Sequence, residues 1–233
     1  MQRATKGAAV AVLVAGTVAG AWAIVDAQRA GLAPPAAPRV LAVTALPAPA
    51  LDGPVSVEAA LARRRSVRAF GAAPVTAAER SQLLWAAQGV TDAAGGRTAP
   101  SAGARYPLEV YAVDPSGVYH YDARGHRLEL IRRGDAGPAL AAAALGQAAV
   151  RRAPLRLVVT GVVARTAAKY GARAERYVLL EAGHAAENVL LEAVALGLGA
   201  VPVGALDGAK VRAALGLPAD QEPIYVIAIG HLP

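Results

Sequence analysis

Arg64-Arg65-Ser66-Val67-Arg68 places three guanidinium groups beside one hydroxyl. Arginine presents a planar fork of donors that matches the oxygens of a phosphate group, so this run predicts a site for a phosphate monoester. Arginine-rich runs also occur at solvated helix ends, and the run by itself leaves both interpretations open. The sequence on its C-terminal side favours the first.

The arginine run opens a series of motifs, which are Arg64–Phe70 (RRSVRAF), Leu83–Gly89 (LLWAAQG), Thr98–Pro107 (TAPSAGARYP), Lys169–Gly171 (KYG), Arg176–His184 (RYVLLEAGH) and Gly199–Ala205 (GAVPVGA). In this order they resemble the FMN-dependent nitroreductase superfamily. The match looks closest to the SagB-type dehydrogenase branch, whose best-known members oxidise azoline rings in modified peptides. The resemblance runs from about Val55 to the C-terminus. It implies an FMN-dependent oxidoreductase that moves a hydride between a small-molecule or peptide substrate and the flavin.

Composition limits the other classes of function. A chain of 233 residues that is 55% hydrophobic can bury one good core, so we expect one catalytic domain with an N-terminal appendage. The net charge of +7 invites a nucleic-acid interpretation, but only 4% of residues are aromatic and no basic stripe alternates with stacking rings. We therefore expect no nucleic-acid partner. The absence of cysteine excludes disulfides and cysteine-ligated metals.

Residues 1–30 predict a membrane anchor or a signal segment. Gly7–Val25 carries no charge, and at 1.5 Å per residue it could cross most of a hydrocarbon core of about 30 Å. Arg3 and Lys6 precede it, which by the positive-inside tendency places the catalytic domain outside the cytoplasm. The alternative is export followed by cleavage near Ala23 or Ala27. Residues 31–54 are rich in Pro and Ala and predict an extended linker.

Residues 55–233 alternate helical and strand patterns, which predicts an α+β domain with a mixed sheet flanked by helices. Hairpin signals and long crossovers both occur in it. Expected helices begin after Ser56, after Thr76, at Pro138 (running to Val150), at Glu175 (running to Leu196) and after Asp207. Expected strands are Leu108–Val113, Val118–Tyr121, Leu128–Ile131, Leu155–Val163 and Ile224–Ile229.

The helix Glu175–Leu196 is apolar on more than one face, so a second partner must cover it. A homodimer would do so. The resemblance implies the same arrangement, with this helix between protomers and each flavin site built from both chains.

The resemblance also assigns residues to FMN. Arg64 and Ser66 are expected to hold the phosphate, with Arg65 beside them. Arg68 is expected near the pyrimidine edge of the flavin, where reduction places negative charge and a nearby cation favours hydride acceptance. The remaining contacts are expected from Pro100, Ser101, Ala102 and Gly103 of the neighbouring protomer, and from the backbone of Val203 and Gly204.

One position departs from the family pattern. Family members commonly place Lys or Arg just after the last strand to complete the phosphate site, whereas His231 stands here. A neutral imidazole donates one hydrogen bond and carries no full charge, so FMN is expected to bind more weakly.

Lys169 and Tyr170 match the Lys-Tyr pair that the azoline-oxidising branch uses for proton abstraction. Dehydrogenation needs a base while a hydride leaves for the flavin, and lysine, unlike arginine, can lose its proton. The other interpretation is an ordinary solvent-facing pair in a polar loop. If no base is needed, the alternatives are an NAD(P)H-dependent nitro or quinone reductase and a non-catalytic, membrane-tethered flavin-binding accessory protein.

Metal and dinucleotide sites are disfavoured. Glu181 and His184 have the Glu-x-x-His spacing of di-iron bundles, but the sequence contains this spacing once, so no metal is expected. Gly197-Leu198-Gly199 begins like a dinucleotide fingerprint but ends a helix, and Pro202 occupies the place of the third glycine.

Overall fold

A computed structural model describes residues 38–233. The predicted anchor or signal segment 1–30 lies outside the described residues. Within residues 38–233, no helix combines the length and the apolar character needed to cross a membrane.

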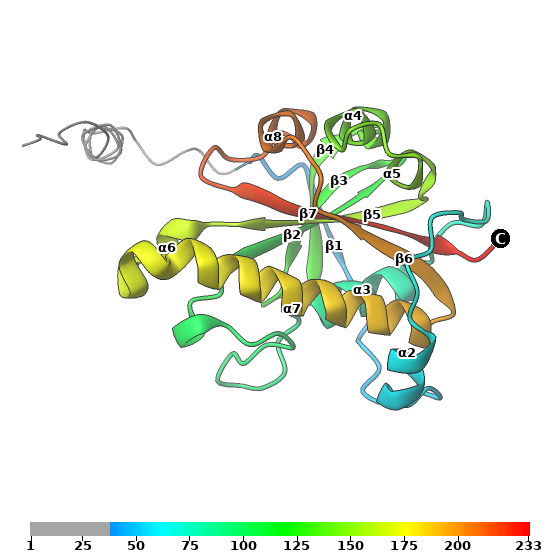
Figure 1. Cartoon of the computed structure of the whole chain (residues 1–233), viewed down its shortest axis with the longest axis horizontal. Coiled ribbons are helices and arrows are strands. Elements are labelled where there is room, and N and C mark those ends of the chain that lie inside the picture. Colours follow the sequence, from blue (N-terminus) through cyan, green and yellow to red (C-terminus); the bar gives the residue numbers. More distant parts are fainter. Residues whose placement is uncertain (1–37) are drawn as a thin grey trace, which may run out of the picture. The chain divides into compact units, whose positions relative to one another are not determined.

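The centre of the fold is a seven-stranded sheet (Figure 1). Its spatial order is β1-β4-β3-β2-β5-β7-β6, and each adjacent pair is antiparallel, so the expected mixed sheet is wrong for the described strands. The long helical crossover joins β5 to β6, which run in the same direction. These two strands are not neighbours, because β7 lies between them and is antiparallel to both. The strands are β1 (Ala42–Ala45), β2 (Leu108–Asp114), β3 (Gly117–Asp122), β4 (Arg127–Arg133), β5 (Leu155–Gly161), β6 (Leu198–Val203) and β7 (Glu222–His231).

Strand β1 lies inside the segment 31–54 that the sequence predicts as a linker. Ala42 pairs with Leu130 of β4, so β1 forms one edge of the sheet. After it, the Pro47 carbonyl accepts a hydrogen bond from Ser81. An edge strand tolerates flanking prolines, which explains why a Pro-rich segment can extend the sheet. The linker prediction is therefore wrong for the part that carries β1.

Helices cover both faces of the sheet. In Figure 1, α3 and α7 lie on one face, whereas α4 and α8 lie on the other. The predicted caps Ser56, Thr76 and Asp207 each accept a hydrogen bond from a first-turn amide. The helices are α2 (Val57–Arg63), α3 (Ala77–Gln88), α4 (Gly137–Ala143), α5 (Ala148–Arg152), α6 (Val163–Tyr170), α7 (Ala174–Ala195) and α8 (Gly208–Leu215), with short 3₁₀ turns η1 (Ala102–Ala104) and η2 (Gly171–Arg173).

Three local predictions differ from the structure. The Ala-rich run after Pro138 is not one helix, because Leu145 and Gly146 have positive φ angles of 57° and 73° that separate α4 from α5. Lys169 and Tyr170 end a helix, α6, instead of lying in a loop. Strand β6 was not expected.

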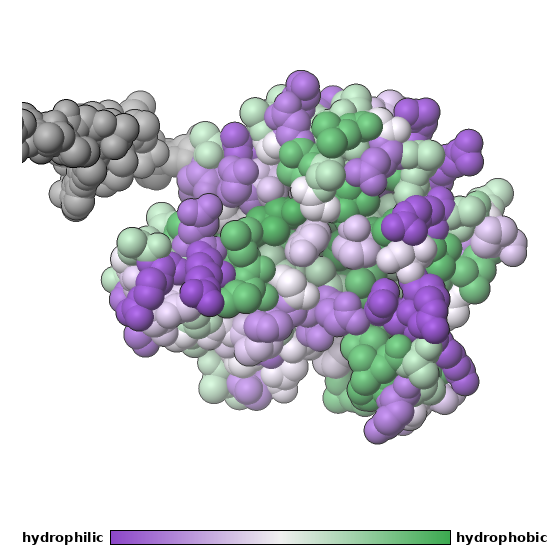
Figure 2. Space-filling model, in the orientation of Figure 1, coloured by the Kyte–Doolittle hydropathy of each residue, from purple (hydrophilic) through white to green (hydrophobic). Residues whose placement is uncertain are grey.

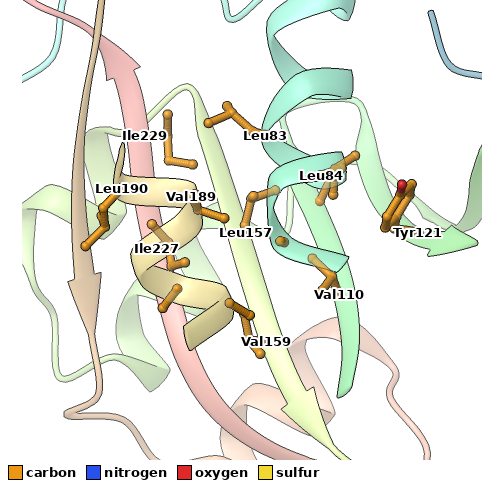
Figure 3. Close-up of a cluster of buried hydrophobic side chains, with 14 of the residues drawn as sticks. Leu83, Leu84, Val110, Tyr121, Leu157, Val159, Val189, Leu190, Ile227 and Ile229 are labelled. Atoms are coloured by element: carbon orange, nitrogen blue, oxygen red, sulfur yellow. The ribbon is translucent and has the colours of Figure 1, made fainter. Parts of the chain in front are cut away.

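The core is divided by the sheet. Leu157 and Val159 of β5 face α3 and α7, whereas Val158 faces α4 and α8, as the two-residue period of a strand requires. Figure 3 shows side chains from both helices meeting the strands on the first face, among them Leu83, Leu84, Val110, Val189, Leu190, Ile227 and Ile229. This packing fixes α7 against the sheet.

Candidate functional site

The arginine run begins where α2 ends and continues along β6. Arg64 is the C-cap of α2. Two residues later, Ser66 forms a parallel bridge with Ala200, and the Val67 amide donates to the Ala200 carbonyl at 3.0 Å. A Cβ atom at Gly199 would lie 2.6 Å from Val67 Cγ1, so this glycine permits the close approach. The run is thus fixed against a sheet edge.

The arginines of this run carry more charge than local carboxylates neutralise. Arg64 Nε lies 3.4 Å from Glu187 Oε1 on α7. Arg65 donates to the carbonyls of Ala62 and Arg64, and Arg68 donates to the Ser66 carbonyl at 3.3 Å. Within the described residues, no carboxylate lies within ion-pair distance of Arg65 or Arg68. Two guanidinium groups are therefore available to an anion.

Strand β6 links this anion site to the predicted ring site. It ends at Val203, three residues beyond Ala200, which is about 10 Å along a strand. Val203 is buried and Gly204 is exposed. The structure therefore brings Ser66 and Val203–Gly204 to one strand, with a spacing suited to a ligand that has a phosphate at one end and a ring at the other.

The loop that follows Pro100 is held in an unusual backbone conformation. Gly103, Ala104 and Tyr106 have φ angles of 60°, 52° and 44°. Positive φ at non-glycine residues costs free energy, so the surrounding structure must hold the loop. The Tyr106 amide donates to Ser101 Oγ at 2.8 Å, and the Arg97 guanidinium lies 4.7 Å from the centre of the Tyr106 ring.

Lys169 and Tyr170 lie against this loop. A Cβ atom at Gly103 would be 2.9 Å from Lys169 Nζ and 2.8 Å from the Tyr170 hydroxyl oxygen. Tyr170 in turn packs edge-on against Tyr177 of α7, with 5.0 Å between ring centres. Two motifs about 66 residues apart in the sequence are thus brought together within one chain.

The arginine run and the Gly103 loop contact different parts of α7. Tyr177 packs on the Lys169–Tyr170 side, whereas Glu187 binds Arg64. Ten residues of α-helix separate Tyr177 from Glu187, which is about 15 Å. One protomer therefore presents two separate groups of predicted site residues, one at each of these positions on α7.

A pocket of about 290 Å³ lies between the loop and α7. Within it, burial raises the pKa of Glu181 to about 7, while hydrogen bonding with Ser101 and the charge of Arg97 oppose this shift. Its lining consists of Pro100, Ser101, Ala102, Tyr177, Leu180, Glu181 and His184. Sequence reasoning considered Glu181 as a metal ligand or as a hydrogen-bond partner of His184. Among residues 38–233, no group of three or more His, Asp or Glu side chains is arranged to hold a metal ion.

His231 stands at the end of β7, paired with Leu198 of β6. Its Nε2 atom lies 3.3 Å from the Pro74 carbonyl oxygen and 3.5 Å from Glu79 Oε2. The structure thus brings the imidazole to the N-terminus of α3, and the assignment of His231 to the phosphate stays a prediction.

A partly buried charge network supports α6 and was not found from the sequence. Arg165 of α6 pairs with Glu109 of β2, and Glu109 Oε2 lies 2.7 Å from His120 Nε2. On its other side, His120 Nδ1 lies 3.3 Å from Glu129 Oε2. Burial lowers the pKa of His120, but Glu109 and Glu129 outweigh burial, so the pKa is raised.

The chain is similar to known proteins across most of this domain. Residues 61–231 match the nitroreductase family. A provisionally named nitroreductase of Methanocaldococcus jannaschii is 41% identical over 184 residues, which cover 76% of this chain and 91% of the relative.

Solved structures agree with this match. The crystal structure of a provisionally named nitroreductase from Ralstonia eutropha has a TM-score of 0.76 at 36% identity, covering 87% of this chain and 96% of that one. Another, from Desulfovibrio desulfuricans in complex with FMN, has a TM-score of 0.58 at 25% identity, covering 77% and 87%. The chain belongs to the nitroreductase family, and the expectation of an FMN-dependent oxidoreductase is confirmed.

Proposed function

We propose that this enzyme is a SagB-like dehydrogenase whose active site is completed by a second copy of the chain. The observation that carries the proposal is the contact of Gly103 with Lys169 and Tyr170. Lys169, the proposed base, lies against the loop that is expected to face the flavin, and a reaction that only reduces the flavin with a nicotinamide needs no such base.

The dimer is supported by the surface of α7. Leu179 and Leu180 are 51% and 52% exposed, although most apolar residues of this helix are buried. Val57 and Leu61 of α2 are also exposed. A green area lies at the lower right of Figure 2, where Figure 1 places α2. Exposed pairs of large apolar side chains on neighbouring helical positions, such as Leu179 and Leu180, fit an interaction site. A two-fold axis near α7 would bring the arginine run of one protomer to the Gly103 loop of its partner.

The described residues fit FMN. Arg64 and Arg65 come directly before the Ser66 hydroxyl in the sequence, so this donor set matches a phosphate, and Arg65 and Arg68 have no carboxylate partner among the described residues. Arg64 and Ser66 would hold the phosphate, Arg68 the pyrimidine edge, and Val203–Gly204 the ring. When bound, FMN supplies a ring that accepts a hydride and returns the electrons to a second acceptor.

Lys169 is proposed to remove the substrate proton. Its Nζ atom lies against Gly103, and it is 5.5 Å from the centre of the Tyr170 ring. The Tyr170 hydroxyl points to the same place, so it can orient the substrate or relay the proton. Arg165, one turn earlier on α6 and paired with Glu109, holds the helix that presents both groups.

Two other functions and the cellular location are kept as proposals. An NAD(P)H-dependent nitro or quinone reductase would use the same flavin site without Lys169, and an accessory protein would bind FMN without turnover. The N-terminal segment is proposed to anchor the domain outside the cytoplasm, with export and cleavage as the alternative. Protection from external protease in intact spheroplasts would contradict that orientation.

The test is anaerobic stopped-flow on wild type and Lys169→Ala, with azoline-containing peptides and NADPH as separate donors. We expect peptide-driven bleaching of the flavin to fall about a hundredfold in Lys169→Ala, the scale of general-base removal, with FMN retained. Tyr170→Phe should cost less. Equal bleaching of both proteins by NADPH, with no donor that depends on Lys169, would favour the reductase.

A further inference from the structure

Helix α7 carries a buried carboxyl group to which the proposed function gives no role. Glu181 is only 3% exposed, and within the described residues its Oε1 atom is fully enclosed without a hydrogen-bond partner. It lines the pocket of about 290 Å³ against Pro100, Ser101 and Ala102. An unpaired carboxyl costs free energy when it is buried, and such groups concentrate at functional sites.

The groups around Glu181 come from three elements. Arg97 approaches from the segment before Pro100, but it donates to Gln88 Oε1 at 3.1 Å and stacks on Tyr106, so it attracts Glu181 without forming an ion pair. Ser101 Oγ accepts a hydrogen bond from the Tyr106 amide, and its place beside the carboxyl favours the ionised form and so opposes the burial that raises the pKa of Glu181. The other titratable groups at the pocket and the adjoining loop are Tyr177 and His184 of α7 and Lys169 and Tyr170 of α6.

Near neutral pH, the Glu181 side chain is therefore present in both its neutral and its ionised form. Burial raises its pKa to about 7, and the opposing effects of Ser101 and Arg97 are smaller. The group that contacts the Pro100–Gly103 loop is therefore neutral in weakly acidic solution and ionised in weakly basic solution. A change in its surroundings shifts this balance.

We propose that Glu181 is a positioning residue for the flavin: its buried carboxyl lines the pocket behind the Pro100–Gly103 loop, and binding of FMN to that loop is coupled to uptake of one proton from solvent by this side chain. The inference rests on the proposed function, in which Pro100–Gly103 contacts the flavin. A cofactor that covers this loop removes water from the pocket and adds negative charge nearby, and both effects favour the neutral acid. The proton converts the carboxylate to the acid, and no bond in FMN changes.

The experiment compares FMN affinity from pH 5.5 to 8.5 in wild type, Glu181→Gln and Glu192→Gln, measured by flavin fluorescence. Gln imitates the neutral acid. Glu192 is the matched control, because it lies on the same helix and burial also raises its pKa, but it lines a different pocket with Trp85. The phosphate of FMN ionises near pH 6 and contributes equally in all three proteins.

Above pH 7, the affinity of wild type and Glu192→Gln should fall relative to Glu181→Gln, by up to about tenfold for each pH unit. Identical pH profiles in wild type and Glu181→Gln would overturn the inference. Wild type gives a second reading without any variant: FMN binding in weak buffer at pH 7.5 should take up protons, and an absence of uptake would overturn the inference as well. If wild type fails to bind FMN at any pH, the proposed function falls with it, and that outcome is recognised by unquenched fluorescence.

Discussion

Arg64 and Glu187 form an ion pair that joins the arginine run to α7, with 3.4 Å between Nε and Oε1. Both side chains are partly exposed, at 33% and 46%, so the pair adds little to stability. Its effect is to hold the Arg64 guanidinium against α7, and within the described residues no other ion pair or side-chain hydrogen bond uses its donors. The arginine run is thereby kept in place before an anion arrives.

Replacing Arg64 with Ala should therefore weaken FMN binding by about ten- to a hundred-fold, or about 1.5 to 3 kcal/mol, because a charge-assisted contact is lost. Glu187→Gln should change affinity by less than about threefold, as expected for an exposed pair. Arg133→Ala is the control for the loss of one positive charge, since Arg133 belongs to β4, which lies near the opposite edge of the sheet from β6. Titration of the apoprotein with FMN measures all three, and an unchanged affinity in Arg64→Ala would remove the phosphate assignment.

Gly103→Ala should displace Lys169 and Tyr170, because the new Cβ would lie 2.9 Å and 2.8 Å from their terminal atoms. The φ angle of 60° adds a cost of about 1 to 2 kcal/mol to folding. Gly134→Ala is the control for the cost of a positive φ angle alone, since Gly134 has a φ angle of 87° and no atom lies within 4 Å of a Cβ built there. Urea unfolding should show similar losses for both variants, whereas turnover should fall only in Gly103→Ala. Equal turnover in the two would contradict the predicted contact.

The His120 network should make stability depend on pH in a defined direction. The pKa of His120 is raised above 6.5, so its contribution is complete below pH 6.5 and is lost as pH rises through the raised pKa. Burial raises the pKa of Glu109, but His120 and Arg165 outweigh burial and lower it, so its contribution is lost only as pH falls below 4.5. The stability difference between wild type and His120→Gln should therefore be largest between pH 4.5 and 6.5 and smaller at pH 9. A difference that grows toward pH 9 in urea titrations would contradict the network.

Leu179→Glu combined with Leu180→Glu should produce monomers and abolish FMN binding, because a charge at each position would be buried in the proposed dimer. Leu145→Glu is the control, since Leu145 is 70% exposed and lies away from α7. Sedimentation velocity distinguishes the species. A double variant that stays dimeric would place the interface elsewhere.

Local signals in the sequence predicted much of the fold. Ser56, Thr76 and Asp207 act within one helical turn, so their caps could be identified without knowledge of the tertiary structure. Strand β1 could not be identified in this way, because its partner β4 lies more than eighty residues away. Proline content was a poor guide there, since edge strands tolerate it.

For a similar reason, the sequence predicted candidate site residues better than the contacts between them. Motifs singled out Arg64, Ser66, Gly103 and Lys169, but which of these residues lie together depends on how the chain folds. The contact of His120 with Glu129 follows from the register of β3 on β4, in which the two residues are directly opposite. Glu181 shows only as one acidic residue within an apolar stretch of α7, and its burial against Ser101 becomes visible in the structure.

Each flavin site is proposed to combine the arginine run of one protomer with the Gly103 loop of the other. At an FMN concentration that saturates wild type but lies well below the raised dissociation constants of the variants, Arg64→Ala and Gly103→Leu homodimers should each bind little FMN. After unfolding together and refolding, half of the dimers should be mixed, and each mixed dimer should have one fully wild-type site, so FMN should bind to about a quarter of all sites. Binding at about a quarter of the wild-type stoichiometry is the predicted result. Binding no greater than that of the separate variants would show that each site lies within a single chain.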